Sequence, residues 1–171
     1  MKHIFAVFLL LATVPTLVYA GPPELQTPAP VIYLADNLDE QDKLGWCIDT
    51  VGRGFAERLH AHSCKPFGGD VQFKYNKATR QIVSATYAGK CAILSAAAAA
   101  GVTLGLVDCS ATSSAQKFDY NNQTSEFRPG SDNGLCLTVG KSSRSAGPFM
   151  SRNLALARCG STAAKFKQWR I

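Results

Sequence analysis

Histidine is scarce in this sequence of 171 residues, and the common catalytic signatures are missing from it. Three histidines limit metal chemistry that needs several imidazole ligands. The sequence has no Gly-x-Ser-x-Gly, His-Glu-x-x-His, P-loop or dinucleotide-binding pattern, which leaves no signal for an esterase, a zinc protease, a nucleotide hydrolase or a dehydrogenase. We therefore predict a protein that is not an enzyme and that needs no metal or cofactor.

The first twenty residues, MKHIFAVFLLLATVPTLVYA, have the organisation of a secretory signal peptide. Lys2 gives a basic start, an apolar run follows, and Ala20 places a small residue where a signal peptidase cuts. A membrane anchor is the alternative, but Pro15 interrupts the run and no basic flank follows it. We expect secretion, to the extracellular space or to a bacterial periplasm or cell surface, where paired cysteines persist.

Beyond residue 20 the chain lacks an apolar run of membrane-spanning length. Residues 92–107 carry no charge, but these 16 residues fall short of the ~20 that cross a bilayer. They include five consecutive alanines at 96–100, which locally favour a helix. We expect no transmembrane segment once the signal peptide is removed.

Two parts of the chain each carry charges of a single sign, the first acidic and the second basic. Residues 21–42 hold five acids and no lysine or arginine, and four prolines lie within residues 21–31. Residues 133–171 hold seven bases and no acid. A basic surface suits anionic partners such as sulfated or phosphorylated glycans or an anionic membrane surface, although such a charge run is more often a solvated face. We do not expect nucleic acid as a partner of an exported protein.

Six cysteines divide the remainder into three similar units. The first cysteine of each unit recurs after 44 and then 45 residues, and the second after 45 and then 50. Each unit opens with glycine two positions before its first cysteine. An aromatic residue follows the second cysteine by nine or ten positions, as Phe73, Phe118 and Trp169.

Three copies of about 45 residues, built of short alternating segments and turns, predict an all-β domain with threefold pseudo-symmetry. One copy could not bury a core alone, whereas three can close a small barrel without exposed edges. The alanine run then lies in the hairpin loop of the second repeat or in a short helical turn there. Composition alone permits 15 disulfide pairings, but the symmetry predicts that each repeat closes on itself. The predicted bridges are Cys47–Cys64, Cys91–Cys109 and Cys136–Cys159.

Repeats of this length, bracketed by cysteines and closed by a Gln-x-Trp-like motif, resemble the ricin B-type (R-type) lectins, and the resemblance covers about residues 32–171. It implies a β-trefoil whose closing aromatics pack in the core. The motif is altered here, because only the second repeat keeps its glutamine, in Gln116-Lys117-Phe118. We expect a signal peptide at 1–20, an acidic, proline-rich arm at 21–42 and the trefoil at 43–171, in which strand pairing could begin near residue 32.

The resemblance also implies one shallow sugar pocket per repeat. In such a pocket a carboxylate two residues after the first cysteine accepts hydrogen bonds from sugar hydroxyl groups. An aromatic ring two residues before the second cysteine stacks on the sugar, and an amide three residues before the closing aromatic forms a further hydrogen bond. The second and third repeats lack these groups, with Ile93, Val107, Thr138 and Ala157 at the first two positions. The first repeat keeps an altered set, which gives the predicted carbohydrate-binding residues Asp49, His60, His62 and Asp70.

Two further hypotheses concern this set. His60 and His62 would share one strand face, and with a carboxylate they could hold a metal ion, although two exposed histidines are more often simply solvated. Their rings would become charged near pH 6.5, which would make ligand affinity sensitive to acid.

The sequence therefore predicts a secreted carbohydrate-binding module without catalysis, with its best pocket in the first repeat. Its partner would be a glycan or glycoconjugate, which could be anionic. The alternative is a degenerate trefoil that acts as a protein-interaction or toxin-associated binding subunit without sugar binding. In that case the acidic arm would suit docking to a basic protein partner.

Overall fold

The computed structural model describes residues 21–171, so the predicted signal peptide at 1–20 lies outside the described residues. The described chain is built of short strands joined by turns and four short 3-10 helices, and it contains no α-helix within residues 21–171. The strands are β1 (Tyr33–Leu34), β2 (Trp46–Thr50), β3 (Leu59–Ser63), β4 (Phe73–Asn76), β5 (Gln81–Ser84), β6 (Lys90–Leu94), β7 (Leu104–Asp108), β8 (Phe118–Asn121), β9 (Glu126–Pro129), β10 (Leu135–Ala146), β11 (Phe149–Arg158) and β12 (Trp169–Arg170).

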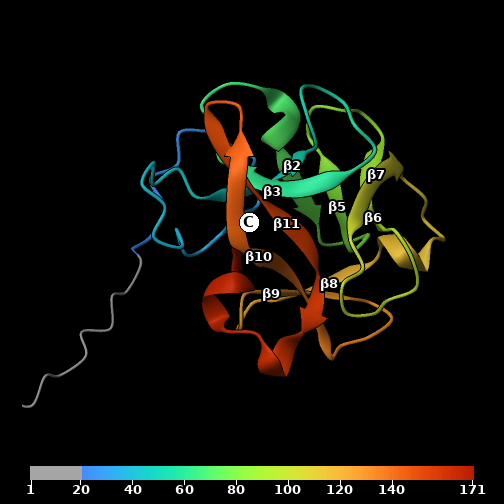
Figure 1. Ribbon diagram of the computed structural model, residues 1–171. Coiled ribbons are helices and arrows are strands. Elements are labelled where there is room, and N and C mark those ends of the chain that lie inside the picture. Colours follow the sequence, from blue (N-terminus) through green and yellow to red (C-terminus); the bar gives the residue numbers. More distant parts are fainter. Residues whose placement is uncertain (1–20) are drawn as a thin grey trace, which may run out of the picture.

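Each repeat consists of two antiparallel hairpins. The first hairpin of each repeat is β2–β3, β6–β7 or β10–β11, and the second is β4–β5, β8–β9 or the pair of β12 with β1. The last pair joins the two ends of the described chain, with Leu34 opposite Trp169. Figure 1 shows the hairpins gathered into one body, with β3 beside β11. The all-β prediction is confirmed, and so is its threefold organisation.

The three predicted disulfides are present, each inside one repeat. Each joins the first strand of a first hairpin to the residue that directly follows the second strand, and so fixes that hairpin before the chain turns into the next one. Such bridges stabilise a fold of short strands because they restrict the unfolded chain.

The closing aromatics form the centre of the core, as predicted. Phe73, Phe118 and Trp169 are fully buried, and they pack with Trp46 and Phe127 in one apolar cluster. Burying an aromatic side chain of this size stabilises a fold by about 2–3 kcal/mol. The aromatic residue that recurs in each repeat therefore belongs to the hydrophobic core and not to a ligand site.

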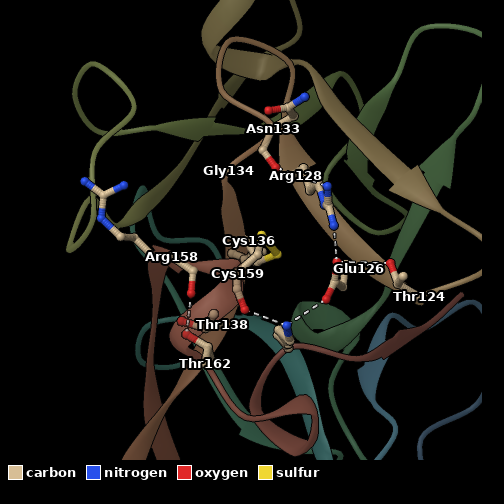
Figure 2. Close-up of a disulfide and its surroundings, with 12 residues drawn as sticks. Thr124, Glu126, Arg128, Asn133, Gly134, Cys136, Thr138, Arg158, Cys159 and Thr162 are labelled. Carbon is tan, nitrogen blue, oxygen red and sulfur yellow. Dashed lines mark hydrogen bonds and ion pairs between the residues drawn. A yellow bond between two sulfur atoms is a disulfide. The ribbon is translucent and has the colours of Figure 1, made fainter.

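The contacts of the closing-motif glutamine are made by a different residue in the third repeat. In the second repeat, which keeps the glutamine, Gln116 donates to the Asp108 carbonyl at 2.8 Å and accepts from the Gln81 side chain at 2.8 Å. In the third repeat Lys167 instead donates to the Cys159 carbonyl at 2.6 Å and pairs with Glu126 at 2.9 Å (Figure 2). An ion pair has replaced an amide pair at the equivalent boundary between repeats.

Residues 21–45 lie against the barrel hairpins (Figure 1). Ile32 is fully buried in the core, and Glu40 forms an ion pair with Arg152 of β11. Gly45 has a φ of +76°, and a Cβ added there would lie 2.4 Å from the Cβ of Pro23. Glycine is therefore required at this position both by the backbone and by the close approach of the arm.

The five alanines at 96–100 lie in the loop between β6 and β7, where they form bends and turns. Gly101 in this loop donates to the Leu156 carbonyl at 2.8 Å, which ties the loop to β11. Tertiary pairing has overridden the helical propensity of alanine. Across residues 21–171, no helix has the length and apolar character needed to cross a membrane.

Candidate functional site

A pocket of about 630 Å³ lies over strand β3 in the first repeat, and we call it the histidine pocket. His60 and His62 form its floor, because side chains two residues apart on a strand point to the same face. Their ring centroids are 5.3 Å apart. The complete lining is Gly52, Arg53, Gly54, His60, His62, Lys65, Phe67, Gly68, Asp70, Ala146, Gly147, Pro148 and Phe149.

A buried ion cluster supports one side of the pocket. The Lys65 ammonium lies 3.0 Å from the Asp49 carboxylate and 2.9 Å from the Asp70 carboxylate. The Asp49 side chain is fully buried, and that of Asp70 is 7% exposed. Gly68 has a φ of +101°, and a Cβ there would lie 2.5 Å from Asp70 Oδ1, so the tight turn before Asp70 requires glycine.

The pocket walls come from distant parts of the chain. The tip of the β10–β11 hairpin contributes Phe149, whose ring meets that of His62 edge-on at 5.9 Å between centroids. The loop between β3 and β4 contributes Phe67, which is 83% exposed. Exposed aromatic surface at the mouth of a polar pocket is a common feature of ligand sites.

Burial controls the protonation of the site. It raises the pKa of Asp49 to about 7, even though the Lys65 charge opposes this change. Burial also lowers the pKa of His60 to about 4, with a further contribution from His62, and it lowers the pKa of His62. Burial alone would lower the pKa of Lys65, but the hydrogen bond to Asp70 and the charge of Asp49 outweigh it and raise that pKa.

Two expectations about the histidines are therefore wrong. Both rings are buried and not solvated, with 6% of each residue exposed, and the ring of Phe149 on β11 packs edge-on against that of His62. Burial lowers the pKa of His60 to about 4 and also lowers that of His62, so His60 in particular gives no charge switch near pH 6.5.

The four predicted site residues lie together, but they do not contribute equally. His60, His62 and Asp70 line the pocket, whereas Asp49 lies beneath Lys65 and is absent from the lining. Lys65 and Asp70 therefore lie nearer to the pocket than Asp49, whose side chain is fully buried. Three buried polar atoms of these residues have no hydrogen-bond partner: Asp49 Oδ1, His60 Nε2 and Asp70 Oδ1.

Sequence reasoning missed Lys65, Phe67 and Phe149. Lys65 and Phe67 lie in the Lys-Pro-Phe-Gly-Gly turn after Cys64, and a solvent-exposed turn with an aromatic residue was an available signal. Phe149 lies in the third repeat, whose longer cysteine spacing was the trace of the extended hairpin.

The metal hypothesis finds no support in the contacts. Lys65 already occupies Asp49 Oδ2, the carboxylate oxygen that lies nearest to both imidazole rings. Within residues 21–171, only Glu126, Cys136 and Cys159 form a group of three metal-type ligands. Figure 2 shows that both cysteines are consumed in a disulfide, and Glu126 is paired with Arg128 and Lys167.

The corresponding positions of the other two repeats lack a polar site. Ile93 and Val107 are half-buried apolar residues on β6 and β7. Thr138 is buried, and its hydroxyl donates to the Ala155 carbonyl at 3.0 Å. The polar groups that the first repeat gathers are therefore not repeated.

No protein-family model matches the chain, and no curated protein matches its sequence. Several solved structures share its fold. The β-trefoil lectin of the Vibrio vulnificus hemolysin/cytolysin, with N-acetyl-D-lactosamine bound, matches with a TM-score of 0.53 and 18% identity over 82% of this chain and 90% of that one. The cytolethal distending toxin from Actinobacillus actinomycetemcomitans gives a TM-score of 0.56 and 17% identity over 82% of this chain and 89% of that one.

A third match is to GalNAc-T7 with UDP, GalNAc and Mn²⁺, with a TM-score of 0.52 and 17% identity. The match covers 88% of this chain but 23% of that enzyme. At these identities the comparisons establish a shared fold. Together with the three hairpin pairs, their internal disulfides and the buried closing aromatics, they show that the chain folds as a β-trefoil.

Proposed function

We propose that the protein is a carbohydrate-binding module without catalytic activity and that the histidine pocket holds the sugar. The observation that carries this proposal is the gathering of unpaired polar atoms and exposed aromatic surface at one pocket of the first repeat. A sugar needs both, because its hydroxyl groups form hydrogen bonds while its C–H face packs on a ring.

The polar contacts would come from Asp70 and His60. Asp70 keeps one carboxylate oxygen free of partners while Lys65 holds the other, and a carboxylate is a strong acceptor for hydroxyl groups. His60 is neutral at physiological pH because burial lowers its pKa to about 4, and its Nε2 is buried without a hydrogen-bond partner, so a side-chain shift that opens it to the pocket would let a sugar hydroxyl group satisfy it. Asp49 acts indirectly, by holding Lys65.

The packing surface would come from His62, Phe67 and Phe149. Phe67 is the most accessible of these rings, and it stands at the pocket mouth. The ligand in the Vibrio lectin is N-acetyl-D-lactosamine, which supports a glycan as the ligand class for this chain as well. Arg53 is exposed in the lining, which favours glycans that carry a sulfate or carboxylate group.

A glycan array tests this proposal, provided that it includes neutral, sulfated and sialylated glycans. We expect selective binding that falls about tenfold or more in Phe67→Ala and in Asp70→Asn. Phe55→Ala is the matched control, because Phe55 is an exposed aromatic residue that does not line the pocket. Binding that survives in both pocket variants, or that is lost in the control, contradicts this placement of the site.

We also propose that the chain is secreted. Three disulfides and no free cysteine within residues 21–171 suit an oxidising compartment. The test is mass spectrometry of the protein recovered from the medium or periplasm. We expect a mature chain that begins at Gly21. An intact first segment on cell-associated protein argues against export.

A second candidate function is that of a toxin-associated binding subunit, and two matches favour it. A cytolethal distending toxin from Haemophilus ducreyi matches this chain with a TM-score of 0.52 and 18% identity, in addition to the Actinobacillus toxin. The arm is less free to dock a basic partner than its sequence suggests, because Glu40 is paired with Arg152. Co-purification of a second chain, with no binding on the glycan array, distinguishes this candidate from the first.

A further inference from the structure

Two equivalent tyrosines fill the boundaries between the second hairpins of the repeats. Tyr75 is the third residue of β4, and its hydroxyl donates to the Phe118 carbonyl at 2.9 Å. Tyr120 is the third residue of β8, and its hydroxyl donates to the Trp169 carbonyl at 2.8 Å. In each case a phenol from one repeat reaches the closing aromatic of the next. The Tyr75 ring also packs edge-on against Phe127, with 5.2 Å between the ring centroids.

The third boundary has no such tyrosine. Trp169 holds the same place in its strand pair, opposite Leu34, as Phe73 does opposite Ser84. Tyr75 follows Phe73 by two residues, and the residue that follows Trp169 by two is Ile171. The carbonyl that a third phenol would reach belongs to Phe73. Among the side chains of residues 21–171, none donates a hydrogen bond to that carbonyl, in contrast to its two counterparts.

A pocket lies at this third boundary, and we call it the third-boundary pocket. Its volume is about 480 Å³, and Phe73, Tyr75, Ile171, Ile32 and Pro30 are among its lining residues. Ile32 and Phe73 are fully buried at its base, whereas Ile171 is 58% exposed. The lining is mainly apolar, and Lys74 contributes a cation.

We propose that the third-boundary pocket binds a tyrosine side chain presented by a partner polypeptide, with the phenol hydroxyl donating to the Phe73 carbonyl. The repeat symmetry identifies the chemistry, because a phenol occupies each of the other two boundaries. Tyrosine suits such a site, since its ring fills apolar space at low entropic cost and its hydroxyl needs one partner. The pocket is larger than one ring requires, so the residues that flank the tyrosine would also find contacts.

Peptide titrations followed by heteronuclear NMR test this proposal. The probes are acetyl-Gly-Tyr-Gly-amide, acetyl-Gly-Phe-Gly-amide and p-cresol. We expect the tyrosine peptide to bind about three- to tenfold more tightly than the phenylalanine peptide, which is the effect of one buried hydrogen bond. Shifts should centre on the amides of β4 and of residues 31–33. Equal affinity for the two peptides refutes the hydroxyl contact, and p-cresol binding as tightly as the tyrosine peptide refutes a polypeptide ligand.

Ile171→Tyr supplies the missing phenol from the chain itself. We expect this variant to have a higher Tm than the wild type and to lose peptide binding, because its own ring would occupy the pocket. Ala97→Tyr is the matched control, since it adds a tyrosine to the exposed β6–β7 loop and should leave peptide binding unchanged.

Ile171→Phe keeps the test decisive should the tyrosine variant prove unstable. It should block the peptide through volume alone, without the gain in Tm that the hydroxyl contributes. Absence of peptide binding to the wild type overturns the proposal, and so does binding that persists in both Ile171 variants.

Discussion

Replacing Asp49 by asparagine should change how the stability of this protein depends on pH. The Asp49 carboxyl is fully buried, and burial raises its pKa from 3.8 to about 7. The folded state therefore holds this proton more tightly than the unfolded state does. The resulting stabilisation is fully present below pH 3.8 and is lost as the pH rises through 7. The gap between the two values corresponds to about 4 kcal/mol of unfolding free energy.

His60 acts in the opposite direction. Burial lowers its pKa from 6.5 to about 4, so its contribution to stability is present above pH 6.5 and is lost as the pH falls through 4. This contribution is about 3 kcal/mol, and His62, whose pKa burial also lowers, has the same sign. Asp49 therefore offsets the histidines in the wild-type protein, and Asp49→Asn leaves them unopposed.

The measurement is urea unfolding without reductant, followed by tryptophan fluorescence between pH 4 and 8. The unfolding free energy of Asp49→Asn minus that of the wild type should rise by about 4 kcal/mol across this range. The control is Asp39→Asn, because Asp39 is exposed and has a φ of 60°, a conformation that asparagine tolerates. Parallel pH profiles for Asp49→Asn and the wild type would refute the assignment of a raised pKa to Asp49.

Three further predictions concern the stability of the fold. Phe118→Ala should lower the unfolding free energy by about 3–5 kcal/mol in urea, because it removes a fully buried ring from the core. Replacing Cys91 and Cys109 together by alanine should lower it by about 3 kcal/mol under non-reducing conditions, and no loss would mean that this bridge is not formed. Glu126→Gln should lower the Tm, because it leaves the largely buried ammonium of Lys167 without its carboxylate partner. Adding Lys167→Gln should recover part of this loss, because the two glutamines can then form an amide pair like that of Gln81 and Gln116 in the second repeat.

The architecture could be predicted from the sequence because its constraints are local and repeated. Cysteine spacing selected one disulfide pairing among 15, and the aromatic residue after each second cysteine marked the core. The loss of glutamine from the third closing motif could not be explained from the sequence. Lys167 replaces it because Glu126 lies beside this position in the fold, and the two residues are far apart in the sequence.

The sequence predicted which residues of the candidate site lie together, but it did not predict that they are buried. Asp49, His60, His62 and Asp70 do lie together, because a hairpin register and a following turn bring them to one place. The strand that pairs with β3 is β11, which belongs to the third repeat, and no local pattern connects it to these residues. Burial then changes the expected titration of the site, since it lowers the pKa values of both histidines and raises that of Asp49.

Departure from threefold symmetry is what creates both pockets. The histidine pocket exists because the third repeat has an extended hairpin, whose tip carries Phe149 to the first repeat. The third-boundary pocket exists because Ile171 stands where the other repeats place tyrosine. At the other two boundaries, Tyr75 and Tyr120 of the chain itself fill the equivalent position. In a triplicated fold, the residues that break the repeat are thus better guides to function than the residues that maintain it.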